Sequence, residues 1–221
     1  MKKHGFGTNF HSIYASNAEL YDAFSRAEHF SPELKAKIKE LIVPGVLLDV
    51  GCGTGHKTNL YSKSFEVAYG LDNSQPLLSY AQKKYPANKK LRFLWASAER
   101  IPLLDESVNT VLITWGSFPL TTSIREMKRV LKPGGVIIRI GVYEKDEFTS
   151  HFPNLDIRRI RRINATFKSE GFMVETAEVE INFHNTDEAK EIMSKIIKAK
   201  KGDIKSAKFS HTVAFCYYKK S

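Results

Sequence analysis

The clearest chemical pattern lies between residues 49 and 55, where the chain reads Asp49-Val50-Gly51-Cys52-Gly53-Thr54-Gly55. The apolar run at residues 46–50 is typical of a strand covered on both faces, and the residues after the glycines favour a helix. Glycines at a strand-to-helix turn let the backbone come close to a ligand, and an acid beside them can meet a cationic group. The pattern therefore predicts a nucleotide-like ligand at the carboxyl end of a sheet.

The spacing of these glycines argues against two other nucleotide sites. The GxGxxG pattern of dinucleotide dehydrogenases needs a glycine at position 56, where this chain has His56, because its third glycine, Gly55, comes one residue early. A phosphate-binding P-loop needs a glycine at a fixed offset before a Gly-Lys-Ser/Thr sequence, and residues 56–58 have none at that offset. NAD and a P-loop nucleotide are both disfavoured.

A second acid follows the next apolar run, because Asp72 ends the sequence Tyr69-Gly70-Leu71-Asp72. It comes nearly twenty residues after the glycine loop, where an acid can accept hydrogen bonds from both hydroxyls of a ribose. Asn73 then lies beside the expected adenine. Taken alone, Asp72 also fits a solvated strand end, so its assignment depends on the glycine loop.

The elements that must position these residues follow from the apolar periodicity. Residues 1–45 look helical in two pieces, and we expect the first 40 residues to be a mobile cover over the site that does not join the core of the sheet. Residues 46–221 then form one compact α/β domain, a mostly parallel sheet of seven strands with helices on both faces. The expected strands are 46–50, 66–71, 91–95, 109–114, 136–140, 172–180 and 209–218, and the expected helices are 75–85, 122–131, 157–169 and 187–201.

Four patches of this chain resemble, in order, those of the class I S-adenosylmethionine-dependent methyltransferases, type 11-like members in particular. They are the complete D-x-G-x-G-x-G loop, Asp72, the segment at residues 95–103, and the helix and Pro-Gly-Gly turn at residues 125–135. The resemblance covers roughly residues 40 to 140. It implies a Rossmann-like three-layer sandwich and an enzyme that transfers a methyl group by in-line displacement, with S-adenosylmethionine as cofactor and S-adenosylhomocysteine as product.

The resemblance also implies which residues bind the cofactor. Ser97 stands where the family usually has an aspartate that reaches the adenine amino group, and its hydroxyl supplies a hydrogen bond without charge. Asn109 replaces the common acid at the start of the fourth strand. The cofactor-binding residues implied by the resemblance are Asp49, Gly51, Cys52, Gly53, Gly55, Asp72, Asn73, Ser97, Ala98 and Thr114.

The acceptor side is less clear from the sequence. In the resembled family the acceptor pocket forms where the fourth strand ends and beneath N-terminal helices, which makes Tyr14, Tyr21, Trp115 and Phe118 the candidates, with ordinary packing as the alternative. His151 is a candidate general base, although a surface histidine is the preferred interpretation. Neither the cysteines, in unrelated contexts, nor the carboxylates form a recognisable metal-ligand set, so no metal site is predicted.

The composition constrains the partners. A net charge of +10 attracts anions, but the lysines are scattered, so a solvated basic surface is the preferred interpretation. No apolar run long enough to span a membrane and no signal peptide is recognisable, which predicts a cytosolic protein. A small-molecule acceptor is the leading hypothesis. An RNA acceptor and a non-catalytic S-adenosylmethionine-binding module are the alternatives, and the oligomeric state is not predicted.

Overall fold

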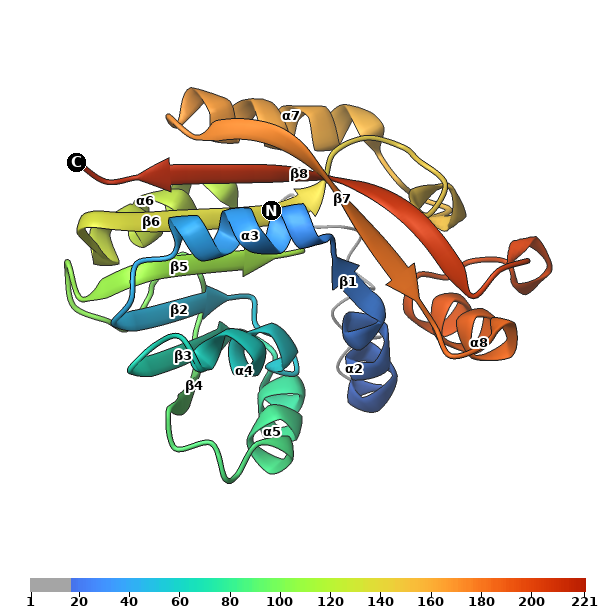
Figure 1. Cartoon of the computed structure of the whole chain (residues 1–221), viewed down its shortest axis with the longest axis horizontal. Helices are drawn as coiled ribbons and strands as arrows, with labels where there is room; N and C mark the ends of the chain where they lie inside the picture. Colours follow the sequence, from blue (N-terminus) through green and yellow to red (C-terminus); the bar gives the residue numbers. More distant parts are fainter. Residues whose placement is uncertain (1–16) are drawn as a thin grey trace, which may run out of the picture.

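A sheet of eight strands runs through the computed structural model, which describes residues 17–221 (Figure 1). The strands lie in the order β1-β7-β8-β6-β5-β2-β3-β4. Their bounds are Glu28–Phe30 for β1, Val46–Val50 for β2, Val67–Asp72 for β3, Leu91–Trp95 for β4, Val108–Thr114 for β5, Leu131–Val142 for β6, Met173–Asn182 for β7 and Lys208–Lys219 for β8.

The parallel half of the sheet agrees with the strands predicted from the apolar runs. Strands β2 to β6 pair in parallel, and β7 and β8 pair antiparallel with each other and, through β8, with β6. One local expectation was wrong, because the predicted Pro-Gly-Gly turn lies inside β6. There Gly134 has a φ of 77°, and the pairing of β5 with β6 is irregular between Val108 and Thr110.

The eighth strand corrects the expected count of seven. Strand β1 pairs antiparallel with β7, with Phe30 opposite Val179. Helix α3 (Pro32–Leu41) then begins at Ser31, whose Oγ accepts a hydrogen bond from Leu34 N at 3.2 Å. Its apolar stripe, Leu34, Ile38 and Leu41, is buried in the same core as residues of β2, β6 and β8. Residues 28–41 therefore belong to the sheet core, contrary to the expectation of a separate cover.

The remaining helices form layers on both faces of the sheet. The bounds are Ala18–Ala27 for α2, His56–Ser62 for α4, Gln75–Lys84 for α5, Leu120–Val130 for α6, Ile157–Ser169 for α7 and Thr186–Ile196 for α8, with short 3-10 turns at Thr149–His151 (η1) and Lys201–Asp203 (η2). Helices α6 and α7 pack on one face and α3 on the other. Helix α2 packs on α8 and contacts α4 and α5, on the side toward which β2 and β5 point (Figure 1).

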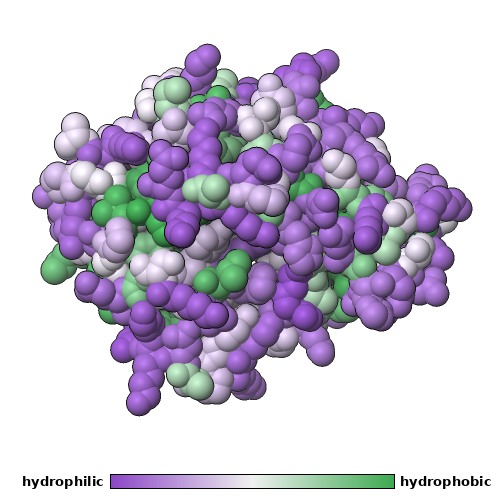
Figure 2. Space-filling view, viewed as in Figure 1, coloured by the Kyte–Doolittle hydropathy of each residue, from purple (hydrophilic) through white to green (hydrophobic). Residues whose placement is uncertain are grey.

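The surface shown in Figure 2 is dominated by hydrophilic side chains, with the hydrophobic ones in small separate patches. Within residues 17–221, no helix is both long and apolar enough to cross a membrane. The same residues contain no group of three His, Cys, Asp or Glu side chains arranged to hold a metal ion.

Candidate functional site

A cavity of about 380 Å³ lies at the carboxyl ends of the parallel strands, bordered by α2. This is the edge at which open α/β sheets bind ligands, and the volume is typical of a cofactor or small-molecule pocket. The predicted residues that the structure brings to its lining come from α2, the glycine loop and the segments after β3, β4 and β5. They are Tyr21, Gly51, Cys52, Asp72, Asn73, Ser97, Ala98, Thr114, Trp115 and Phe118.

The glycine loop folds back onto strand β3. The amides of Gly51 and Cys52 both donate to Leu71 O, at 2.7 and 3.1 Å. Gly51, Gly53 and Gly55 all have positive φ, with values of 78°, 55° and 75°, a region that glycine enters without steric cost. Gly53 also lies directly against α2, because a Cβ atom on it would stand 2.6 Å from Tyr21 Cε1.

Asp72 connects the loop to the end of β3. Its Oδ2 accepts a hydrogen bond from Gly53 N at 2.9 Å, and its Oδ1 accepts one from Ser74 N at 2.8 Å, just before α5. The carboxylate therefore lies between the glycine loop and the start of α5, and it lines the cavity. An acid at this point can accept hydrogen bonds from a ribose while it fixes the loop beneath.

Asp49 has a different environment, because it is fully buried beneath the loop and is not part of the cavity wall. Its Oδ2 accepts a hydrogen bond from the Thr58 hydroxyl at 2.6 Å, while Oδ1 has no hydrogen-bond partner in the described part of the chain. Burial raises the pKa of Asp49 to about 7, and the Thr58 hydrogen bond only partly offsets this effect. Asp49 therefore contacts α4, and its charge depends on pH near neutrality.

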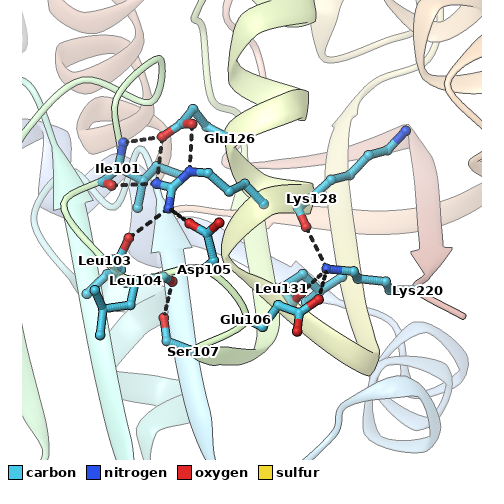
Figure 3. Close-up of polar contacts among 11 residues, drawn as sticks. Ile101, Leu103, Leu104, Asp105, Glu106, Ser107, Glu126, Lys128, Leu131 and Lys220 are labelled. Atoms are coloured by element: carbon cyan, nitrogen blue, oxygen red, sulfur yellow. Dashed lines mark hydrogen bonds and ion pairs between the residues drawn. The ribbon is translucent and has the colours of Figure 1, made fainter.

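The segment that carries Ser97 and Ala98 is fixed by an ion-pair cluster on α6 (Figure 3). Arg129 donates to the carbonyl oxygens of Ile101 and Leu103 and to Asp105, and Glu126 accepts from Ile101 N at 2.9 Å. The hydrogen bond from Arg129 lowers the pKa of Glu126, which keeps that carboxylate ionised. The loop after β4 is thereby fixed to the helix on the face of the sheet.

Trp115 forms the wall of the cavity where β5 ends. Its backbone has a φ of 59°, a left-handed conformation that is uncommon for a bulky residue and is often found at functional sites. Its Nε1 donates to Glu28 Oε1 at 2.7 Å, and its ring stacks on His211 with ring centroids 5.1 Å apart. Trp115 is therefore held on both sides in a fixed orientation.

Glu28 and Lys57 form an ion pair at the same wall. Lys57 Nζ lies 3.0 Å from Glu28 Oε2, and the side chains are only 6% and 4% exposed. Lys57 also lies 4.1 Å from the centre of the Phe30 ring. Both charged residues line the cavity, and neither was predicted from the sequence.

Comparisons with known proteins agree with this geometry. The sequence profile described as "Methyltransferase domain" matches residues 48–139, from β2 to β6. A SAM-dependent methyltransferase of Aquifex aeolicus has the same fold, with a TM-score of 0.57 and 18% identity over 92% of this chain and 96% of that one. The chain belongs to the class I S-adenosylmethionine-dependent methyltransferases. S-adenosylmethionine is the cofactor of this family.

Two sequence relatives show how far the similarity extends. A malonyl-acyl-carrier-protein O-methyltransferase of Pectobacterium atrosepticum is 30% identical over 54% of this chain and 47% of its own length. An uncharacterised protein of Methanocaldococcus jannaschii is 29% identical over 88% of this chain and 92% of its own length. The chain spans about half the length of the first curated relatives that it matches.

Four residues predicted for the methyltransferase site do not line this cavity. Asp49, Gly53 and Gly55 lie in or beneath the glycine loop, and His151 lies in η1, where its ring packs edge-on against Phe209 at 5.3 Å. Tyr14 lies outside the described residues. Besides Glu28 and Lys57, the sequence missed Phe148 and Phe152 in the wall, since both come from the segment after β6 that carries no recognisable motif.

Proposed function

We propose that this chain transfers the methyl group of S-adenosylmethionine to a small-molecule acceptor at the aromatic end of the cavity. The observation that carries the proposal is the two-sided character of the cavity. Polar groups of Asp72, Asn73 and Ser97 line one part, and α2 and the loop after β5 supply aromatic rings to another. The bound cofactor supplies the electrophilic methyl group, and the protein must align the acceptor and exclude water.

The residues that hold the cofactor are part of this proposal. Asp72 would accept the hydrogen bonds of the ribose, Asn73, Ser97 and Ala98 would contact the adenine, and the amides from Gly51 to Gly55 would face the amino-acid end. Cys52 and Thr114 complete the wall, and Asp49 supports the loop from beneath. These residues fit the group, because the positive φ values leave the loop backbone bare on the cavity side.

The acceptor would lie against Tyr21, Trp115 and Phe118. Aromatic faces exclude water from the reacting atoms and also attract a cationic sulfonium through their negative π surface. The Glu28 carboxylate, which accepts from Trp115 and pairs with Lys57, is placed at the same wall to orient a polar acceptor group. The name of the malonyl relative, which specifies an acyl substrate, is consistent with an acceptor that is not a macromolecular surface.

A labelled-donor assay tests the proposal. The pure protein would be incubated with methyl-labelled S-adenosylmethionine and either a metabolite extract or total RNA. Transfer to metabolites supports the proposal, whereas salt-sensitive transfer to RNA would favour the RNA alternative, since phosphate contacts weaken steeply as salt rises. Binding without transfer to either pool indicates a non-catalytic S-adenosylmethionine-binding module.

Calorimetry with S-adenosylhomocysteine, S-adenosylmethionine and NAD provides the companion measurement. Heat of binding with the first two and none with NAD is the expected result, and tight NAD binding alone would contradict it. We further propose a cytosolic location, which is supported by the two buried free thiols, Cys52 and Cys216, because thiols persist in reducing compartments.

A further inference from the structure

A second cavity, of about 440 Å³, lies beside the first and has a buried arginine in its wall. It is bounded by the loop after β5, the end of β6 and helix α7. Arg139 of β6 is only 8% exposed and lines this cavity. A buried guanidinium is costly unless an anion compensates its charge, so its partners decide what the cavity can hold.

The protein supplies Arg139 with neutral partners. Its Nη1 donates to Asn164 Oδ1 at 2.8 Å and to Cys216 Sγ at 3.4 Å, and the guanidinium lies 4.7 Å from the centre of the Phe167 ring. Among residues 17–221 no carboxylate lies within ion-pair distance of Arg139. Residues 1–16 contain neither Asp nor Glu. No side-chain carboxylate of this chain therefore neutralises Arg139.

The edge of the guanidinium formed by Nε and Nη2 has no acceptor in the described part of the chain. Gly141 borders that edge, because a Cβ on it would stand 2.6 Å from Nη2 and 3.3 Å from Nε. This edge is the one that binds a carboxylate or phosphate through two parallel hydrogen bonds. The glycine thus leaves room beside the donor pair that an anion would use.

Further charges and apolar groups line the same cavity. Arg159 and Arg162 reach it from α7, whereas Arg158 and Arg161 of the same helix do not line it. The apolar part of the lining includes Phe118, Ile160 and Ile163. A ligand that suits this lining has an anionic group at one end and an apolar body.

The second cavity also adjoins the cofactor cavity. Both are lined by the loop residues 115–119 and by Val142. We propose that the second cavity binds the anionic end of the methyl acceptor, a carboxylate or a phosphate monoester joined to an apolar body. This proposal rests on the proposed methyl transfer, since it assigns the acceptor's anchoring group to Arg139 and Arg162.

The first test measures binding without catalysis. Phenyl phosphate, benzoate and neutral phenol would be titrated by calorimetry into the protein saturated with S-adenosylhomocysteine. At least one anion is expected to bind, phenol to bind at least tenfold more weakly, and the stronger anion to identify phosphate or carboxylate as the group. Equal binding of phenol, or no binding of either anion, overturns the proposal.

Matched variants locate the binding. Arg162→Gln and Arg139→Gln should each weaken anion binding at least tenfold, while Arg158→Gln on the same helix should leave it unchanged. Arg139→Lys and Gly141→Ala keep the positive charge but alter the two-donor edge, and they serve if Arg139→Gln does not fold. Anion binding unchanged in Arg162→Gln and in the folded variants at residues 139 and 141 would place the anion elsewhere and overturn the proposal.

The second test separates this proposal from the proposed function. A metabolite extract would be divided by anion exchange and each fraction assayed with labelled donor. Label in the retained, anionic fraction that is reduced in Arg162→Gln supports both proposals. Label only in the unretained fraction overturns the anionic acceptor but leaves methyl transfer standing. No label in either fraction contradicts the acceptor role of the cavity together with the proposed function, and the calorimetry then decides only whether the cavity binds anions.

Discussion

Tyr21 of α2 lies on Gly53 of the glycine loop so closely that a Cβ atom on the glycine would stand 2.6 Å from its ring. Gly53→Ala should therefore destabilise the protein by about 2 kcal/mol, through strain at positive φ and through displacement of the ring, and should weaken S-adenosylhomocysteine binding. Urea unfolding and calorimetry measure the two effects.

Gly134→Ala is the matched control for the strain, because Gly134 also has positive φ but its Cβ would meet no atom within 4 Å. It should cost only the strain and leave cofactor affinity unchanged. The double variant Tyr21→Ala/Gly53→Ala should lose the steric contribution. Equal effects of Gly53→Ala and Gly134→Ala would show that the Tyr21 contact is unimportant.

Asp72→Ala should weaken binding of S-adenosylhomocysteine by about 2 kcal/mol, since it removes the ionised acceptor for the ribose and frees Gly53 N. Asp72→Asn keeps one neutral acceptor for Gly53 N and should lose less. Calorimetry gives both affinities, with thermal unfolding as the folding control. A dissociation constant unchanged in both variants would remove Asp72 from the site.

Glu28→Gln should destabilise the protein by about 3 kcal/mol, because it leaves the buried Lys57 ammonium without its carboxylate. Replacing both members, as in Glu28→Gln/Lys57→Met, should restore much of the lost stability. Denaturant unfolding of the single and double variants measures the coupling. Additive losses would mean that the ion pair contributes through its separate packing contacts alone.

Asp49 should make stability depend on pH between about 4 and 7. Its folded-state pKa is raised to about 7 by burial, so its contribution is complete below the unfolded pKa, near 4, and is lost as pH rises through 7. The loss should be on the order of 3 kcal/mol. Asp49→Asn should flatten this part of the stability curve, which thermal unfolding across the pH range measures.

A second acid separates this effect from general acid unfolding. Burial alone would raise the pKa of Asp146, but hydrogen bonds from His211 and Thr149 outweigh it and lower the pKa to about 2. Its contribution is present above pH 4 and is lost as pH falls through 2. Asp49→Asn should leave that acidic limb in place. An unchanged slope between pH 4 and 7 would contradict the role of Asp49.

Helix α2 should become more protected from hydrogen exchange when S-adenosylhomocysteine binds. Tyr21 and Phe24 line the cofactor cavity, so a bound ligand adds contacts that favour the closed position of this helix. Exchange measured with and without ligand, with α3 as the internal reference, tests this. Protection confined to the glycine loop would identify α2 as fixed packing.

The parallel strands and the cofactor loop were predictable because their signals are local. Apolar runs mark β2 to β5, and the acid and glycines stand together in the sequence. Strand β1 could not be found this way, since Glu28-His29-Phe30 is too short for a period and becomes a strand only by pairing with β7. Glu28 and Lys57 were missed for the same reason, because tertiary structure alone brings them together.

The pairing of β1 with β7 also sets an order of assembly. Strands β2 to β6 can pair as soon as they are synthesised, but β1 waits for β7, more than a hundred residues later in the chain, and α2 waits for α8. Contacts of such long sequence separation form late, because the intervening chain must first be ordered. The earliest helix and strand of the described chain are thus the last to be placed, and the nascent protein acquires its closed cofactor site only when synthesis of β7 and α8 is complete.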